Sequence, residues 1–590
     1  MSPAAAAAAT GSPSICPDAN VSAFGPNVCV FNDTMSQATI QTDLNNIANQ
    51  QVPNQFGPQR YAVFFEPGTY GSASDPLVFT IGYYTTVAGL GLNPGGVVIN
   101  GAIDSVNQCS DGSCTALDNF WRSVSNLTIN VTGGTGCYAN AEFWAVSQAS
   151  PMRRVHINGN VTLFDYCSSP SYSSGGFIAD SQFTGGTVIN GSQQQFMTRN
   201  SDLDGWTNSV WNQVFCGTKG APPQDFVMGG NQYTTLASCP VTEEEPFLYT
   251  DSRGNYNVFV PAVQQNSSGP SWNSGTAAGT SVPLSKFFVA SPGMSGAAIT
   301  AALAQGKDLI LSPGVYDLNQ PIVVPHPDTV VLGLGMATLV PQHGNAAMVV
   351  VRNTGVKVSG LIIDAGPVNS PVLVSVGTPG PSSASDPDLI QDVFFRIGGA
   401  ETTPVSATVS LLDNAGNSII DDVWAWRADH GNAVGWTVNK ADTGVAVTGN
   451  DVTAYGLFTE HYQKNEVIWS GQGGTDIFFQ NELPYDPPSQ SAWMASPTQD
   501  GYPAFLVTPN VKSFQGYGMG SYVVFIQTSA TLFNAEAFQA PKTPGVQFHD
   551  LLGVWIAGSG GDNSIINGVG GPVTSTNPGT VEPVDLVSYP

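Results

Sequence analysis

Short stretches in which apolar and polar residues alternate recur along the chain. Two examples are VSNLTINVT at 124–132 and VKVSGLIIDA at 356–365. Alternation with a period of two predicts strands that bury one face. Their recurrence at roughly 20–25 residues predicts a β-solenoid, in which each coil buries its inward side by stacking on the next. The alternative interpretation of the same strands is a pair of β-sandwiches.

One large duplication divides the chain. Residues 67–70 (PGTY) align with 313–316 (PGVY), and a Gly-x-Gly follows each, at 89–91 and at 333–335. A helix-like stretch precedes each copy, at 36–50 and at 295–307. This pattern predicts two β-helix domains, each opened by a helix, a strand, a Pro-Gly turn and a second strand.

The duplication predicts the domain limits. We expect a disordered segment at 1–14, which reads as a mature or recombinant N-terminus, and a β-helix domain at 15–263. A Gln/Ser/Gly-rich linker follows at 264–284. The second domain is expected at 285–590, with a Pro/Thr-rich tail at its end.

The charge balance narrows the class of partner. The chain has 17 basic and 43 acidic residues among 590, a net charge of −26. This excess disfavours nucleic acid, anionic membranes and polyanionic substrates such as pectate, because like charges repel. The sequence also has no apolar run of about 18 residues that would span a membrane. A neutral partner is therefore expected.

The cysteines indicate an oxidising compartment. All eight lie in the first 240 residues, and we expect each to pair with its neighbour in sequence. Seven Asn-x-Ser/Thr sequons begin at Asn20, Asn32, Asn126, Asn130, Asn160, Asn190 and Asn266. Together these features favour a secreted, extracellular glycoprotein. The absence of Cys-x-x-Cys disfavours zinc.

Two glutamates in a charge-poor segment are candidates for chemistry. Glu460 and Glu482 lie 22 residues apart, and a coil of about 22 residues returns the chain one rung higher, about 4.8 Å away. Two carboxyls at that range raise each other's proton affinity, so that one can act as an acid while the other is ionised. The alternative is a polar ladder on a solenoid face. Glu466, between them, is expected to be solvated.

The residues of this region resemble a known family. The duplicated opening, WAWRADHG at 424–431 and the block GLFTEHYQ…VIWSGQGGTDIFFQNELPYDPP at 456–488 are similar to glycoside hydrolase family 55. That family consists of secreted β-1,3-glucanases. The resemblance implies an all-β fold of two tandem right-handed parallel β-helix (pectin-lyase-like) domains packed side by side. The loop VTEEEPFLYTDSRGN at 241–255 has no counterpart in the family pattern.

The resemblance also implies roles. Glu482 matches the general acid, and Glu460 belongs to the group that positions water for an inverting attack. Gln148 in AVSQAS and Ser174 in SYSSGG match the other members of that group, with Ser173 as the alternative serine. One-rung spacing suggests carboxyls closer than the roughly 6.5–9.5 Å usual for inversion, and the sequence leaves this tension open.

Further residues are candidates for binding sugar. Arg427, Asp429 and His430 are expected to fix a turn at the cleft by an internal ion pair, with a catalytic role as the alternative. Asp486 either binds a terminal sugar hydroxyl or caps the YDPP turn. The substrate-binding candidates are Trp144, Trp426, Asp429, His430, Trp436, Trp469, Tyr485, Asp486 and Trp493.

The resemblance thus implies a secreted, exo-acting, inverting hydrolase of β-1,3-glucan, which we expect to be monomeric and without metal or cofactor. One alternative is a β-helix polysaccharide lyase, which needs a carboxylate cluster for Ca²⁺ and a basic residue near a uronate. We find no such constellation among the 17 basic residues. The other alternative is a non-catalytic solenoid that binds carbohydrate or mediates adhesion.

Overall fold

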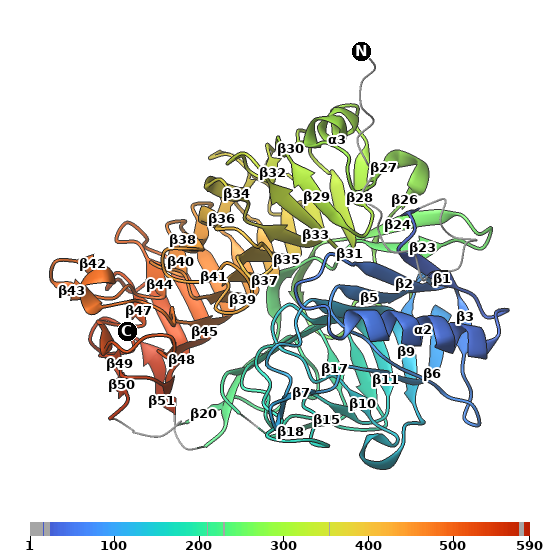
Figure 1. Ribbon diagram of the computed structural model, residues 1–590, viewed down its shortest axis with the longest axis horizontal. Helices are drawn as coiled ribbons and strands as arrows, with labels where there is room; N and C mark the ends of the chain where they lie inside the picture. The colour runs from blue at the N-terminus through green and yellow to red at the C-terminus, as the bar shows by residue number, and fades with distance from the viewer. Residues whose placement is uncertain are drawn as a thin grey trace.

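The computed structural model describes residues 16, 24–208, 210–227, 230–352, 354–380, 382–576 and 583–590. The expected disordered segment at 1–14 and the sequon at Asn20 lie outside these residues. Strands dominate, and they form two stacks that lie side by side (Figure 1).

The first half of the chain coils into a parallel stack. Its largest sheet runs through β1 (Val28–Phe31), β2 (Tyr61–Phe65), β5 (Thr85–Gly89), β9 (Arg122–Val131), β11 (Pro151–Asn158), β13 (Phe177–Ala179), β16 (Phe196–Arg199), β19 (Gln213–Cys216), β21 (Gln232–Leu236) and β20 (Asp225–Phe226). Of these neighbours only β20 and β21 pair antiparallel. The strands β3 (Gly68–Tyr70), β4 (Leu77–Thr80), β6 (Val97–Asp104), β14 (Gln182–Thr184) and β17 (Asp202–Leu203) join the same sheet.

The second half repeats this plan. Its twelve-stranded sheet contains β27 (Phe287–Ala290), β28 (Asp308–Leu311), β29 (Val315–Leu318), β31 (Val330–Pro341), β33 (Lys357–Asp364), β35 (Leu389–Ile397), β37 (Ile419–Arg427), β39 (Thr453–Glu460), β41 (Gly474–Glu482), β45 (Phe514–Val524), β48 (Val546–Ala557) and β51 (Pro583–Tyr589). A second parallel sheet contains β30 (Ile322–Val324), β32 (Met348–Val350), β34 (Ser370–Val376), β36 (Ser406–Asp413), β38 (Lys440–Val447), β40 (Val467–Trp469), β44 (Phe505–Val507) and β47 (Phe538–Gln539). Parallel pairing of successive coils confirms the β-helix prediction and excludes two antiparallel sandwiches.

Apolar ladders inside the coil explain why it stacks. Val393, Val423, Leu457, Phe479 and Met519 occupy matched positions on five successive strands, and all are buried in one core. Each such side chain contributes about 1.5–3 kcal/mol by leaving water. A register shift of one residue would turn the whole row outward, so the ladder also fixes the register.

Each half opens as the duplication predicts. Helices α2 (Gln37–Gln51) and α3 (Gly296–Leu303) begin after Ser36 and Ser295, whose side chains accept backbone N–H groups of the first turn. The duplicated tyrosines also match. The Tyr70 hydroxyl donates to the last carbonyl oxygen of β1 at 3.0 Å and to that of the residue four positions earlier at 2.7 Å. Tyr316 repeats this with the last carbonyl oxygen of β27 at 3.0 Å and that of the residue four positions earlier at 2.8 Å.

An aromatic layer joins the two stacks. Tyr84 and Trp121 from the first half pack against Trp424 and Trp426 of β37 in one buried cluster. Strands β2 and β5 lie beside β31 in the same region (Figure 1). The outward faces of both coils are therefore buried where they meet.

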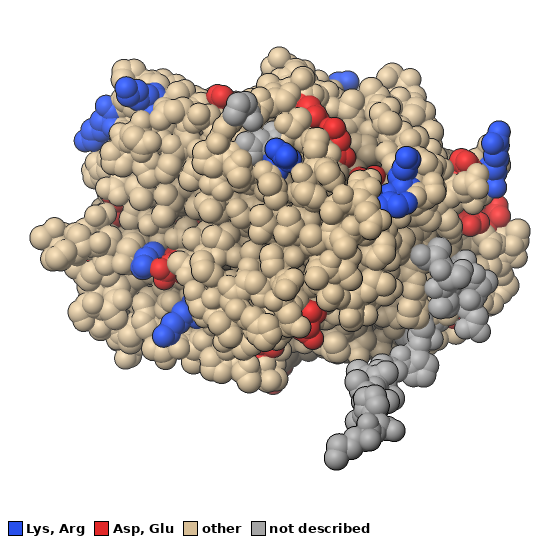
Figure 2. All heavy atoms as spheres, turned by 90° about the horizontal axis from the view of Figure 1, so that it is seen from above, with Lys and Arg blue, Asp and Glu red and all other residues tan. Residues whose placement is uncertain are grey.

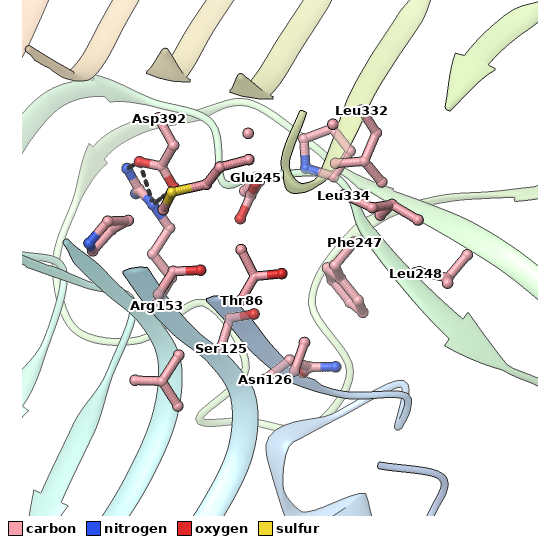
Figure 3. Close-up of a pocket in the computed structure, with 18 of the residues that line it drawn as sticks. Thr86, Ser125, Asn126, Arg153, Glu245, Phe247, Leu248, Leu332, Leu334 and Asp392 are labelled. Atoms are coloured by element: carbon pink, nitrogen blue, oxygen red, sulfur yellow. Dashed lines mark hydrogen bonds and ion pairs between the residues drawn. The ribbon is translucent and has the colours of Figure 1, made fainter. Parts of the chain in front are cut away.

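Buried ion pairs cross this interface. Arg199 of β16 binds Glu244 with two hydrogen bonds, of 2.6 and 2.9 Å, and also pairs with Asp421 of β37. Arg153 of β11 binds Asp392 of β35 at 2.6 Å (Figure 3). Because every one of these groups is nearly inaccessible to water, each charge depends on its partner.

The three glutamates at 243–245 form part of the same interface. Glu243 pairs with Lys357 of the second half at 2.9 Å, and Glu244 pairs with Arg199 of the first. The Glu245 side chain points into a pocket between the two stacks (Figure 3), and its removal from bulk water raises its pKa to about 8. The acidic loop without a family counterpart thus connects both halves.

The segment 264–284 is also hydrogen-bonded to its surroundings. Strand β25 (Gln264–Ser267) pairs with β22 (Cys239–Thr242), and β26 (Gly279–Pro283) pairs with β24 (Tyr256–Pro261). The fifteen-stranded sheet ends before this segment and the twelve-stranded sheet begins after it. The domain limits given above stay a prediction.

The covalent and surface features agree with the sequence. Disulfides join Cys16–Cys29, Cys109–Cys114, Cys137–Cys167 and Cys216–Cys239, which confirms pairing between sequence neighbours. Charged side chains are few and scattered on the face in Figure 2. In the described part of the chain, no helix combines the length and the apolar character needed to cross a membrane.

The interface pairs predict a large effect on stability. Replacing Arg199 by Met leaves Glu244 buried without its cation and leaves Asp421 with only the longer contact to Arg153 at 3.4 Å, so we expect a loss of about 3–5 kcal/mol. The control is Lys464→Met, which breaks an exposed pair with Asp442 and is expected to change stability by less than about 1 kcal/mol. Calorimetric melting of both variants tests this, and equal melting temperatures would contradict it.

A buried acid predicts how stability depends on pH. Neither oxygen of Asp476 has a hydrogen-bond partner, and burial raises its pKa well above the usual value. Above about pH 3.9 the unfolded chain releases this proton while the folded chain retains it, so stability falls as pH rises. Asp476→Asn removes this loss. We expect the variant to melt at a higher temperature than the unmodified chain at pH 8, with the difference shrinking towards pH 4; a difference independent of pH would refute this.

Candidate active site

The two glutamates singled out by their spacing end neighbouring strands. Glu460 closes β39 and Glu482 closes β41, and the two are direct register partners, as the coil length predicts. Both line a cleft of about 310 Å³ between the halves. Phe120 and Trp426, which belong to the aromatic layer, also line this cleft. Its walls therefore come from both halves of the chain.

Glu460 is held by donors from both halves. Gln148 Nε2 donates to Glu460 Oε1 at 2.8 Å across the interface, and Trp424 Nε1 donates to Oε2 at 2.9 Å. Gln148 belongs to the first half, and Trp424 lies on β37, the strand next to Glu460. Each carboxyl oxygen thus has its own N–H donor, which favours the ionised form.

Ser174 completes this group. Its Oγ accepts Gln148 Nε2 at 3.3 Å and Gln195 Nε2 at 3.1 Å. With both lone pairs occupied, the hydroxyl proton remains available for a donor bond into the cleft. Ser173, the alternative serine, is also buried, but it does not line the cleft.

A second serine supports the pair from behind. The Ser147 hydroxyl donates to the carbonyl oxygen of Ala116 at 2.8 Å and accepts the backbone N–H of Ser174 at 2.9 Å. Ser147 precedes Gln148 directly, so it fixes the backbone that carries both polar side chains. The spacing of Gln148 and Ser174 is therefore set by the fold of the first half.

Glu482 has a different environment. The Tyr485 hydroxyl donates to Glu482 Oε2, and the glutamate side chain remains 15% exposed towards the cleft. Among the described residues, the hydrogen-bond partners of Glu460 and Glu482 do not overlap. The two carboxyls thus turn to different surroundings although their backbones are adjacent.

Burial makes the two glutamates share a proton. Desolvation, reinforced by the nearby Glu482, raises the pKa of Glu460 well above its usual range, and desolvation raises the pKa of Glu482 to about 7. Two such groups near each other titrate as a pair, so one proton is retained around neutral pH. This is the charge state that an acid working beside a carboxylate needs. The rise in pKa does not by itself place the proton on Glu482, since it is at least as marked at Glu460. The two N–H donors to Glu460 favour Glu482 as the carrier of the proton.

An ion pair orders the loop after Glu482. Arg427 donates to both oxygens of Asp486 at 2.8 Å and to the carbonyl oxygens of Asn439 and His461. This explains the expected supporting role of Arg427, although its partner is Asp486 rather than a neighbour in sequence. The pair anchors the turn on which Tyr485 stands.

Asp429 and His430 lie on the cleft wall. His430 Nδ1 is 3.0 Å from Asp429 Oδ1, and its Nε2 contacts Gln55 of the first half. Burial acts to raise the pKa of Asp429, but the hydrogen bond from His430 and the nearby imidazoles lower it to about 2. Asp429 is therefore a fixed negative charge in the cleft.

The aromatic candidates divide into two groups. Trp426 and Tyr485 line the cleft. The structure does not bring Trp144, Trp469 and Trp493 there, because each is fully buried inside a coil, and Trp436 lies outside the lining beside Arg427. The expectation that Glu466 is solvated is wrong: it is buried, and its Oε1 accepts the backbone N–H of Tyr462.

Sequence reasoning missed several residues of the site. Trp424 and His461 lie within the stretches at 424–431 and 456–488, but nothing in the pattern distinguished them from their neighbours, and Gln195 lies in none of the motifs named above. Trp424 lies two positions before Trp426, and side chains two apart share a face of a strand, so this spacing was the available signal. Within the described ranges no group of three or more His, Cys, Asp or Glu side chains is arranged to hold a metal ion.

Comparisons with known proteins agree with this geometry. Residues 287–482 match the family model described as a LAM55 pectate lyase-like domain. An exo-beta-1,3-glucanase of Streptomyces sp. (strain SirexAA-E / ActE) is 46% identical over 569 residues, which cover 96% of this chain and 90% of that protein. A probable glucan endo-1,3-beta-glucosidase of Arthroderma benhamiae is 32% identical over 173 residues, 25% of this chain and 19% of that protein.

Solved structures are similar over the same length. The structure of sacteLam55A from Streptomyces sp. SirexAA-E has a TM-score of 0.89 and 44% identity, covering 96% of this chain and 99% of that one. A variant of that protein in complex with glucose has a TM-score of 0.88 and 44% identity, with coverage of 96% and 98%.

Proposed function

The chain belongs to glycoside hydrolase family 55, and from that premise we propose that it removes glucose from the non-reducing end of β-1,3-glucan by an inverting reaction. The observation that carries the proposal is the register pairing of Glu460 with Glu482 at a cleft where Gln148 of the other half reaches Glu460. Similarity to an exo-beta-1,3-glucanase supports the substrate class.

Glu482 is the proposed general acid. It faces the cleft, and its raised pKa keeps it protonated up to about neutral pH. It donates its proton to the glycosidic oxygen as the bond to the sugar carbon breaks. Tyr485 holds the carboxyl by donating to its other side and so directs the proton towards the substrate.

Glu460, Gln148 and Ser174 are proposed to position the attacking water. The free hydroxyl proton of Ser174 binds the water oxygen, and the water donates one proton to Glu460, which acts as the base. The carboxyls of Glu460 and Glu482 have different partners, and this divergence supports a separation large enough for water between them. On this proposal the two carboxyls lie farther apart than their backbones, which lie on adjacent rungs.

The sugar-binding wall is proposed to consist of Trp426, Asp429, His430 and Tyr485. Trp426 is only 1% exposed and so backs this wall rather than offering a free ring, whereas Asp429 accepts hydrogen bonds from sugar hydroxyls. Because the cleft already contains several acids, a neutral polysaccharide suits it better than a polyanion. We further propose that the chain is secreted, which its four disulfides support. We also propose that it acts as a monomer.

The acid assignment predicts a selective loss of activity. Glu482→Gln is expected to lower kcat on laminarin by about 10²–10⁴-fold, because the leaving oxygen then lacks a proton donor. An aryl β-glucoside with an acidic leaving group needs less protonation and should lose less. Glu536→Gln, partly exposed and outside the cleft, is the control. Full activity of Glu482→Gln would refute the assignment, and initial release of β-glucose, followed by NMR, would refute inversion.

The water site predicts a kcat effect from the other half of the chain. Gln148→Met keeps the length of the side chain but removes the donor to Glu460, so we expect kcat on laminarin to fall about 10–10³-fold with little change in KM. Ser174→Ala should behave alike. Stopped assays of glucose release give both constants, and a rise in KM at unchanged kcat would show that these residues bind substrate rather than position water.

A further inference from the structure

The imidazole of His461 lies between two acids of the cleft. Its Nε2 is 3.9 Å from Asp429 Oδ1 and 3.9 Å from Glu482 Oε2, and the side chain is only 3% exposed. The residue follows Glu460 directly, and its backbone N–H donates to the carbonyl oxygen of Glu482 at 2.9 Å. The backbone of His461 is thus joined to both proposed catalytic glutamates, which keeps its ring beside them.

The hydrogen bond on the other side of the ring fixes its tautomer. Nδ1 lies 3.3 Å from the carbonyl oxygen of Leu483, which can only accept, so Nδ1 carries a proton. Burial lowers the pKa of His461, which favours the neutral ring. The lone pair of Nε2 therefore faces Asp429 and Glu482.

The surroundings hold the ring in this place. The edge of Tyr485 packs on it with ring centroids 4.2 Å apart. Arg427 donates to the His461 carbonyl oxygen at 3.2 Å. The charged and titratable groups around the ring are Arg427, Asp429, Glu460, Glu482, Tyr485 and Asp486, with His430 behind Asp429. Of these, only Asp429 and Glu482 lie within 4 Å of Nε2 as ion-pair partners among the described residues.

We propose that His461 is a positioning residue that acts through the acid. It returns a proton to Glu482 after each turnover. This role rests on the proposed function, because it requires that Glu482 give up its proton to the substrate. Once Glu482 is a carboxylate, the ring lies between two anions, which favours its protonated form. Asp429 supplies the fixed charge that stabilises the imidazolium.

The proton balance is simple. The proton that Glu460 has taken from the attacking water passes through water in the cleft to Nε2, which forms the imidazolium and restores the Glu460 carboxylate. The Nε2–H bond then breaks as the O–H bond of Glu482 forms, and the ring returns to its neutral tautomer. Nε2 lies 3.9 Å from Oε2, the oxygen that accepts the Tyr485 hydroxyl. Rotation of the Glu482 side chain therefore has to bring its other oxygen to hydrogen-bonding distance of Nε2, and rotation back turns the new O–H towards the substrate.

The test is the pH profile of His461→Asn. The Asn amide keeps a donor for the Leu483 carbonyl but has no titratable Nε2. We expect kcat on laminarin to fall about 10²-fold near pH 7, with KM within about twofold. The deficit should shrink to a few-fold near pH 4, because hydronium then protonates Glu482 directly. A loss that is the same at every pH, or no loss, would overturn the role.

Two further measurements separate relay from packing. Imidazole added to His461→Gly should restore kcat, and the degree of rescue should follow the basicity of substituted imidazoles; rescue by non-basic azoles to the same extent would contradict the proposal. His156→Asn, a half-buried histidine bonded to Thr184, is the control expected to retain activity. If the unmodified chain releases no glucose, the proposed function fails with this role. If the unmodified chain is active and the pH profile of kcat for His461→Asn runs parallel to that of the unmodified chain, only the role of His461 fails.

Discussion

The relative position of the two β-helices depends on buried charges that neither half can satisfy alone. Arg199 extends from the first half to Asp421 in the second and is held from its other side by Glu244. Such groups are expensive to bury unpaired, so docking in any other register would leave several of them unsatisfied. The aromatic layer supplies apolar contact, but the ion pairs make that contact specific. A site whose residues come from both halves can be precise only because this interface admits one arrangement.

The rungs of the second coil fix the positions of Glu460 and Glu482, as the interface between the halves fixes the position of Gln148. Parallel register places the two glutamates side by side, and the apolar ladder beneath them holds that register. Different partners then give the two carboxyls different tasks: two N–H donors enclose Glu460, whereas Glu482 keeps an open side. One repeated backbone geometry thus yields two chemically distinct acids.

Local patterns were enough to predict the coils, their capping helices, the disulfide pairs and the rung on which each glutamate lies, because each follows from neighbours along the chain or one coil away. The residues that were missed or misplaced have two other causes: cover by the second β-helix, and burial inside the coil. A period of two separates the inward from the outward face, but it does not say which outward faces the second β-helix covers. Trp424 and the loop at 243–245 are buried by that contact. Glu466 is buried by the coil itself, where a carboxyl is kept neutral rather than solvated.

Buried acids without a cationic partner make both the stability of the fold and the activity of the proposed acid decrease as the pH rises. Asp476 in the core and Glu482 in the cleft both have raised pKa values because burial penalises their charge. In the core, ionisation weakens the fold as pH rises, and in the cleft the same ionisation removes the proton that the proposed acid must donate. Asp429 is the exception, since His430 stabilises its charge. Because Glu460 and Glu482 share one proton, the cleft carries less negative charge than its acids could supply, which allows a neutral sugar chain to enter a protein whose net charge is −26.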